Sequence, residues 1–349
     1  MSRQVDFAPT QVLFRAVRRN FKYWENIDIS KSDLENVRRL VILGFEKPIT
    51  QIRALELVTK AYPIIERFGE ISTWIKTLER ALHKFRLDIP EASRLMNILG
   101  LLNWKLGEYE TAKRYHESAI SLSRGSKKFL AESQYGLAQS LWPLGKYSEA
   151  ETNCEEALRY FEAQDELTRS TAAAQNLIGM IHFSQGKFKQ AVGDFYRAYS
   201  NFRKAKDVVG IARSLNNRAM NKAQLGEIRQ AIRFYYQAAK YFSLVDDDLG
   251  VCQVLTSLGI LYCRTGRSTK AKEVLQQAIP ADWEPPAAIC HRGWLTLVQG
   301  YLYLSKGEPK NAAVLFDESR AYWGAVGNVR MQSIVESGLA EAIKTNSLT

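Results

Sequence analysis

The chain has 349 residues, of which 46% are hydrophobic and 24% charged, and this composition excludes wholesale disorder. Its net charge of +11 favours acidic partners: nucleic acid, an anionic membrane surface or an acidic protein segment. Its 4 cysteines include no C-x-x-C pair, which excludes a disulfide framework and gives no support to a zinc or redox site.

The N-terminal part, residues 1–50, lacks the apolar core of a secretion signal and any segment long enough to cross a bilayer, so we expect a cytoplasmic protein. Apolar spacing predicts helices over residues 10–25 and 32–43, with Ser32 as an N-cap. The first helix is either an amphipathic docking helix with a solvated basic face, which we favour, or a nucleic-acid-binding or effector element. Its basic residues are Arg15, Arg18, Arg19 and Lys22.

From about residue 55 onward, small residues recur in phase. A glycine returns at intervals of 38, 38, 41, 40, 40 and 41 residues, with small residues five and twelve positions after it and seven before it. Small residues let two antiparallel helices approach closely, and glycine ends the first helix of a pair in the left-handed conformation. Apolar residues spaced three and four apart predict helix throughout, so the fold class is all-α. The recurring glycines are Gly69, Gly107, Gly145, Gly186, Gly226, Gly266 and Gly307.

Segments such as LLNWKLGEYETAKRYHESAI, at residues 101–120, resemble the tetratricopeptide repeat (TPR) family. The resemblance covers residues 55–325, as about seven helix pairs, and implies a right-handed superhelix whose first helices line a concave groove. The period near 40 and joins such as KAKDVVGIARSLNN, at residues 204–217, are similar to those of bacterial signalling TPR proteins, which include quorum-peptide receptors.

Two domains are expected, a helical N-terminal extension over residues 1–50 and a repeat solenoid over 51–349. A proline-rich break at residues 280–286 precedes the seventh pair, because proline stops helices. Residues 329–345 are expected to form a closing helix, since a solenoid end needs a cap with a polar face.

Catalytic motifs are missing from the sequence. No phosphate-binding loop, dinucleotide fingerprint, nucleophile elbow or H-E-x-x-H pair occurs. Cys290 and His291 are adjacent, but neighbouring side chains on a helix do not face each other. We therefore expect no enzyme activity, no cofactor and no metal.

A binding groove is the more informative expectation. Counting back ten residues from the turn glycines gives Asn97, Asn176 and Asn216 equivalent positions in the implied groove. Asparagine offers a peptide backbone both the donor and the acceptor that it needs, although the same side chain can equally well only bind water. Trp294 and Tyr301 share this groove register, with packing between repeats as the alternative for each aromatic residue. The predicted peptide- or partner-binding residues are Arg94, Asn97, Trp104, Tyr135, Gln139, Trp142, Asn176, Phe183, Arg213, Asn216 and Asn217.

Basic residues concentrate between residues 197 and 240, a segment that contains ten lysines and arginines but only two acidic residues, Asp207 and Glu227. Arg218 and Lys222 stand where the repeat usually has a leucine and a tyrosine. Buried charge is costly unless it is paired, so these side chains either reach solvent or face a carboxylate or phosphate. The second alternative predicts an anion site formed by Arg213, Arg218 and Lys222.

These patterns together predict a non-enzymatic scaffold or regulator that holds a protein or peptide segment, with an acidic one favoured by the charge, in the concave groove. One alternative is an RNA- or nucleic-acid-binding TPR protein that uses the basic cluster over residues 197–240. Another is a regulatory subunit that stimulates or inhibits an enzyme partner.

Overall fold

The computed structural model describes residues 33–68, 71–85, 87–164, 168–278, 289–325 and 327–346, and the elements in these ranges are helices without a strand. The predicted all-α repeat fold is confirmed, whereas the helix expected over residues 10–25, Ser32, Gly69 and the break at 280–286 lie outside the described residues. The helices are α2 (Leu34–Phe45), α3 (Pro48–Phe68), α4 (Ile71–Lys84), α5 (Ile89–Leu106), α6 (Tyr109–Leu122), the short 3-10 turn η2 (Ser123–Gly125), α7 (Lys127–Leu141), α8 (Tyr147–Glu162), α9 (Thr168–Ser184), α10 (Phe188–Lys204), α11 (Val208–Gln224), α12 (Ile228–Ser243), α13 (Asp248–Arg264), α14 (Ser268–Ala278), α15 (Ile289–Ser305), α16 (Pro309–Ala325) and α17 (Val329–Asn346).

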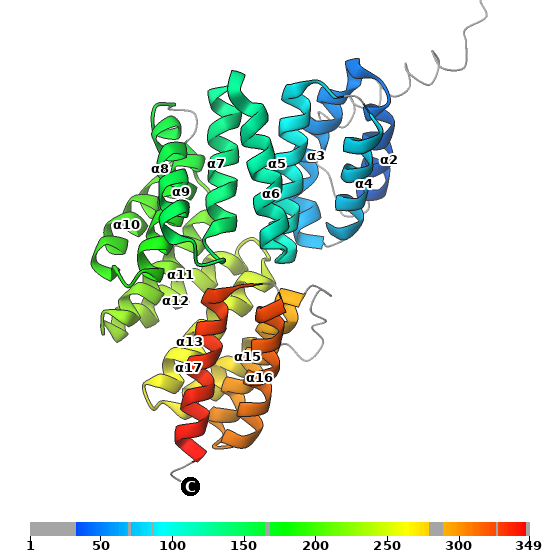
Figure 1. Ribbon diagram of the computed structural model, residues 1–349. Coiled ribbons are helices and arrows are strands. Elements are labelled where there is room, and N and C mark those ends of the chain that lie inside the picture. The colour runs from blue at the N-terminus through cyan, green and yellow to red at the C-terminus, as the bar shows by residue number, and fades with distance from the viewer. Residues whose placement is uncertain are drawn as a thin grey trace, which may run out of the picture. The chain divides into compact units, whose positions relative to one another are not determined.

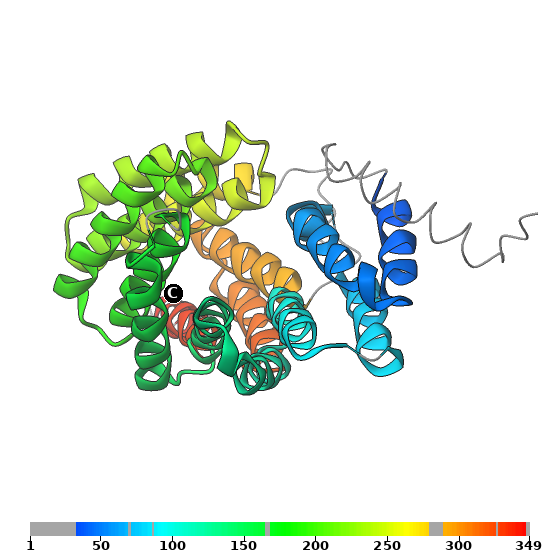
Figure 2. The ribbon, with the colours of Figure 1, turned by 90° about the horizontal axis from the view of Figure 1, so that it is seen from above.

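Successive helices pack as antiparallel pairs, α9 with α10, α11 with α12, α13 with α14 and α15 with α16. Figures 1 and 2 show α8 to α12 as a continuous stack of such helices, each pair lying against the next. The first helix of each pair is called helix A below, and the second helix B. The closing helix expected over residues 329–345 is α17, which packs on α16.

The turn glycines have the backbone conformation that the sequence predicts. From Gly107 to Gly307 all six have positive φ, between 69° and 85°. Most side chains would be strained there, because a Cβ atom makes the left-handed region costly and glycine has none. The repeating glycine therefore marks the place where helix A ends and the chain reverses.

A second set of glycines, which lie inside the A helices, allows close contact between helices. A Cβ atom on Gly100 would lie 2.5 Å from the Nε2 atom of His116, and one on Gly179 would lie 2.7 Å from the ring of Phe195. Both rings are fully buried. The large side chain of helix B thus fills the space that the glycine of helix A leaves open.

The chain divides into two compact units. The first extends to Leu106 and includes Thr111–Ser133, and the second joins Gly107–Glu110 to the residues from Gln134 onward. In the first unit, apolar side chains of α2 to α5, among them Phe45, Trp74 and Leu99, form one buried core. The expected domain boundary at residue 50 stays a prediction.

Within the second unit, the turn before α17 docks on two earlier turns. The backbone N–H of Val329 donates to the carbonyl of Pro143 over 3.0 Å. The Nδ2 atom of Asn328 donates to the hydroxyl of Tyr109 over 3.1 Å, although 219 residues separate them. Both side chains are buried, so this contact ties the last described turn to the beginning of the same unit.

Candidate functional site

Three successive A helices of the second unit bring the central predicted residues together. Tyr135 lies on α7, Asn176 on α9, and Arg213, Asn216 and Asn217 on α11. We call these five residues the asparagine face. Their helices run side by side in register because each repeat places the same A-helix position at nearly the same distance from its turn glycine.

The two asparagine-bearing helices are joined directly. The Nδ2 atom of Asn217 donates to the Oδ1 atom of Asn176 over 3.0 Å. Asn217 is buried, and Asn176 is half-buried. Asn217 therefore positions the amide of Asn176, which keeps its own Nδ2 on the side away from this bond.

The side-chain carboxamide of Asn216 has weaker hydrogen bonds than that of Asn176. Its Nδ2 atom lies 3.7 Å from the Sδ atom of Met220, and a thioether is a weak acceptor. Its buried Oδ1 atom has no hydrogen-bond partner within the described ranges. An unsatisfied buried acceptor of this kind costs free energy.

Tyr135 and Arg213 influence each other electrostatically. Desolvation raises the pKa of the Tyr135 phenol, and the positive charge of Arg213 acts in the opposite direction. The Tyr135 ring also contacts Phe161 edge-on, with 6.4 Å between centroids. Tyr135 thus occupies on α7 the position that asparagine has on α9 and α11, beside the exposed Arg213.

Predicted aromatic residues at the C-terminal ends of the A helices also lie in the second unit. Trp142 donates from Nε1 to the hydroxyl of Ser184 over 3.0 Å, which links the ends of α7 and α9. Phe183 packs edge-on against Phe188, with 5.4 Å between ring centroids. Both side chains are half-buried, as is Gln139 one turn away from Trp142.

Three predicted residues belong to the first unit instead. Arg94 stacks over Phe129 with 5.7 Å to the ring centroid, and Trp104 lies beside the ammonium group of Lys105. Asn97 accepts a hydrogen bond of 2.7 Å from the Nδ1 atom of His116 on α6. The carboxamide oxygen of Asn97 is therefore bonded to a histidine of its own helix pair. By contrast, that of Asn176 accepts from Asn217 on another A helix, and that of Asn216 has no partner among the described residues.

The last helix pair favours the packing alternative for its aromatic residues. Tyr301 is buried, with its ring 5.0 Å from that of Phe316 between centroids. Trp294 is half-buried and meets Trp323 edge-on at 6.1 Å.

The three residues of the predicted anion site have different surroundings. Lys222 forms an ion pair of 2.7 Å with Glu227, the residue that follows turn glycine 226. Arg218 lies among aromatic rings, 4.4 Å from the centroid of Phe234. Because Arg213 lies five residues before Arg218, the two side chains leave α11 in different directions, with Arg213 on the asparagine face. The sequence indicates this partner of Lys222, because Glu227 directly follows the turn glycine Gly226.

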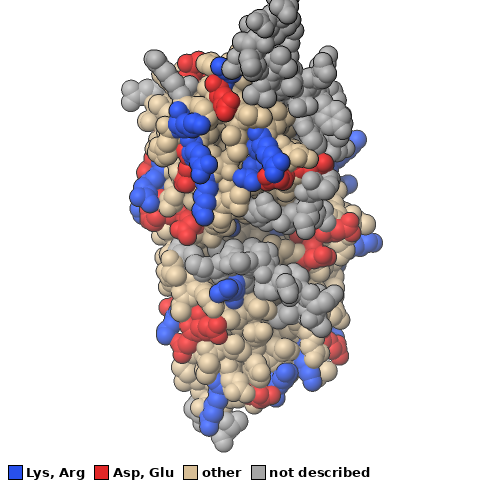
Figure 3. Space-filling model, turned by 90° about the vertical axis from the view of Figure 1, so that its right-hand side faces the viewer, with Lys and Arg blue, Asp and Glu red and all other residues tan. Residues whose placement is uncertain are grey.

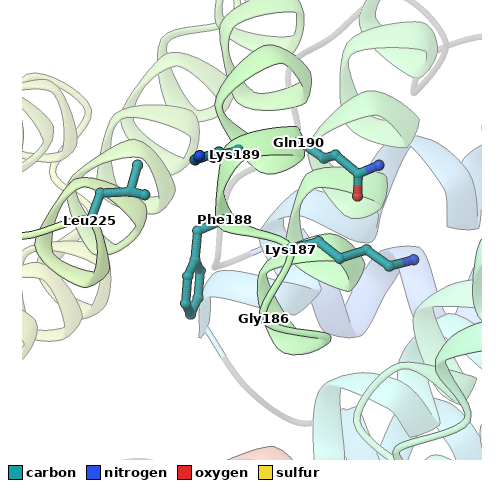
Figure 4. A pocket seen from close by; sticks show the side chains of 6 residues that line it. All are labelled: Gly186, Lys187, Phe188, Lys189, Gln190 and Leu225. Carbon is teal, nitrogen blue, oxygen red and sulfur yellow. The ribbon is translucent and has the colours of Figure 1, made fainter.

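A surface hollow lies outside the asparagine face. It is formed where the turn from α9 to α10 approaches the end of α11 (Figure 4). Phe188 and Leu225 provide its apolar walls, and Lys187 and Gln190 point away at its edge. The carbonyl of Phe188 accepts from the Nδ2 atom of Asn221 over 3.0 Å, so the hollow belongs to the packing between two repeats.

Two other kinds of site, a membrane span and a metal centre, have no candidate in the part of the chain that the structure describes. None of the described helices is long and apolar enough to cross a membrane. No cluster of three or more histidine, cysteine, aspartate or glutamate side chains in these ranges could hold a metal ion. Cys154, Cys252 and Cys263 are free thiols, and burial raises the pKa of Cys252 to about 11.

The fold and this face define the chain as an α-helical repeat protein. Sequence profiles described as tetratricopeptide repeat match residues 93–125, 129–204 and 210–282, so the chain belongs to the tetratricopeptide repeat family. No curated protein matches the sequence.

Solved structures of two Rap proteins and of an aspartyl phosphate phosphatase share the fold. A Rap protein complexed with competence and sporulation factor is 15% identical, with a TM-score of 0.58, and the match covers 95% of this chain and 98% of that one. The Rap conjugation gene regulator of plasmid pLS20, in complex with the Phr* peptide, is 13% identical over 90% of this chain and 95% of that one, with a TM-score of 0.59. Aspartyl phosphate phosphatase F from Bacillus subtilis is 13% identical over 98% and 96% of the two chains, with a TM-score of 0.53.

Proposed function

We propose that the chain is a non-enzymatic peptide-binding regulator that holds an extended segment of a partner along the asparagine face. The observation that carries this proposal is the carboxamide of Asn216, whose Oδ1 atom has no hydrogen-bond partner within the described ranges. An extended peptide presents backbone N–H and C=O groups together, and a carboxamide can pair with both.

Two further features support the proposal. Asn176 lies one repeat away and is held by Asn217, so two carboxamides stand on neighbouring A helices at the spacing of the repeat. Arg213 adds positive charge, which suits a segment that carries a carboxylate, from a side chain or a C-terminus. The fold is also one in which a solved relative, the pLS20 regulator, holds a peptide.

The test begins with the full chain and a mixture of random heptapeptides. Bound peptides are eluted and sequenced by mass spectrometry, and the affinity of one synthetic hit is then measured by calorimetry. We expect at least one heptapeptide to be retained. Failure to retain any peptide from a mixture that includes acidic sequences would contradict the proposal.

Asn216→Leu is the decisive variant. Leucine has nearly the same size but neither donor nor acceptor, and loss of one backbone pairing corresponds to about a tenfold weaker affinity. Folding should be preserved, because the change removes a buried acceptor that has no partner. The matched control is Asn153→Leu on α8, where the asparagine donates to the carbonyl of Glu149 on its own helix. Equal affinities in the two variants would overturn the role of Asn216.

A further inference from the structure

A second cluster of side chains lies on the other side of α11 from the asparagine face. Arg218 is two residues beyond Asn216, and positions two apart on a helix point about 200° away from each other. Arg218 therefore extends between the B helices α10 and α12. We call the residues gathered there the arginine–tyrosine cluster: Tyr196 and Tyr199 on α10, Arg218 on α11, and Arg233 and Phe234 on α12.

Aromatic rings surround the Arg218 guanidinium. Its Cζ atom lies 4.4 Å from the ring centroid of Phe234, 5.0 Å from that of Tyr199 and 5.9 Å from that of Tyr196. Arginine stacks on rings with its flat face and keeps its N–H donors in the plane of the guanidinium. Contact with these rings thus holds the group in place by cation–π attraction.

Arg218 is a cation without a carboxylate nearby in the part of the chain that is described. Burial lowers its pKa, and so does the positive charge of Arg233, while Tyr199 and Tyr196 act in the opposite direction. Arg233 stacks on the same ring, with 5.4 Å from its Cζ atom to the centroid of Phe234. Two guanidinium groups therefore lie near one phenyl ring, an arrangement that an anion would stabilise.

The acidic residues of this segment are already engaged. Asp194 pairs with Arg197 over 2.7 Å, Asp207 with Arg169 over 2.6 Å, and Glu227 with Lys222 over 2.7 Å. Between residues 188 and 243 these are the only aspartates and glutamates in the sequence. Among the described residues, none of these three carboxylates pairs with Arg218 or Arg233.

We propose that the arginine–tyrosine cluster is a docking site for an acidic segment of a partner protein, separate from the peptide site on the asparagine face. Exposed tyrosine together with arginine is the composition of protein-interface hot spots, and Tyr196 is 61% exposed. Two arginine forks at one ring suit one or two carboxylates bound through paired N–H donors. A nucleic acid would instead need cations spaced along successive phosphates. Figure 3 shows another face of the molecule, on which basic and acidic side chains are interspersed.

The probe is a fluorescein-labelled peptide of twelve residues with alternating glutamate and alanine, and its affinity for the full chain is measured by fluorescence anisotropy. The matched peptide has glutamine in place of glutamate. We expect the glutamate peptide to bind and the glutamine peptide to bind at least about tenfold more weakly, because charge-assisted pairs are lost.

Arg218→Leu introduces the residue that the repeat usually has at this position, so the variant should fold, and its thermal unfolding by circular dichroism checks this. Arg80→Leu makes the same substitution at an exposed site on α4 and changes the net charge equally. We expect about a tenfold loss of affinity for Arg218→Leu and less than about a twofold loss for Arg80→Leu.

Three results would overturn the proposal. Equal losses in Arg218→Leu and Arg80→Leu would show that only net charge attracts the peptide. Tighter binding of single-stranded oligouridine than of the glutamate peptide, abolished by Arg218→Leu, would assign the cluster to nucleic acid. Absence of glutamate-peptide binding at low salt, in a variant series that is folded, would show that the cluster has only a packing role.

Discussion

At the scale of single residues, burial determines the ionisation of His116. The imidazole is fully buried against Gly100, and desolvation lowers its pKa to about 3. Its Nδ1 atom donates to Asn97, and its buried Nε2 atom has no hydrogen-bond partner in the described part of the chain. The folded protein therefore contains the neutral ring at all pH values above about 3.

This predicts a pH dependence of stability. An unfolded histidine binds a proton below about pH 6.5, whereas the folded one does not, so stability is complete above pH 6.5 and decreases as the pH falls toward 3. The loss amounts to about 1.4 kcal/mol per pH unit at most. Urea unfolding at pH 7, 6 and 5, followed by circular dichroism, measures it. In His116→Gln, which has a donor but does not titrate, the decrease should be smaller by this amount. The same slope in both proteins would contradict the prediction.

At the scale of helices, the two classes of glycine serve different physical purposes. Gly226 has a φ of 79° and no atom within 4 Å of an added Cβ, so only its backbone conformation excludes other residues. Gly179 lies inside a helix, where an added Cβ would lie 2.7 Å from the ring of Phe195. One glycine forms a turn, and the other allows two helices to touch.

Substitutions separate the two purposes. Gly226→Ala should cost about 1 kcal/mol of folding free energy through left-handed strain, and Gly226→Asn should cost less because asparagine tolerates that conformation. Gly179→Ala should cost about 1–3 kcal/mol through overpacking. Thermal unfolding of the three variants provides the comparison. A larger loss for Gly226→Asn than for Gly226→Ala would show that the turn conformation is not the reason for glycine.

At the scale of the whole molecule, the second unit is held together by contacts between its ends. Asn328 is central to them, because its Oδ1 atom accepts from the N–H of Met331 at the start of α17 while its Nδ2 atom donates to Tyr109. The Asn328 side chain thus caps the N-terminus of α17 and links it by a hydrogen bond to Tyr109, just after the turn at Gly107.

A double-mutant cycle measures this fastening. Asn328→Ala removes both bonds and should cost about 1–2 kcal/mol, the range for a lost N-cap. Tyr109→Phe removes only the hydroxyl and should cost about 1 kcal/mol. Since both variants delete the same Asn328–Tyr109 bond, the double variant should lose less than the sum, by about 0.5 kcal/mol or more. Additive losses in urea unfolding would contradict a direct contact.

The sequence predicts the fold well because the repeat is local: a turn glycine, an alanine and apolar spacing lie within one helix pair. The partners of the polar residues follow less directly. Asn97 and Asn216 have equivalent positions, yet a histidine on the neighbouring helix engages only the first. The Asn328–Tyr109 contact joins residues too far apart for any local pattern. Tyr196 and Tyr199 lie three residues apart and therefore on one face of α10, and this spacing could have indicated the rings around Arg218.

Photo-crosslinking shows directly whether a peptide lies along the asparagine face. A photoreactive copy of the heptapeptide selected by the full chain is irradiated in the complex, and the modified residues are identified by mass spectrometry. We expect adducts on α9 and α11 near Asn176 and Asn216, and their loss in Asn216→Leu. Adducts concentrated on the B helices α10 and α12, unaffected by that substitution, would contradict it.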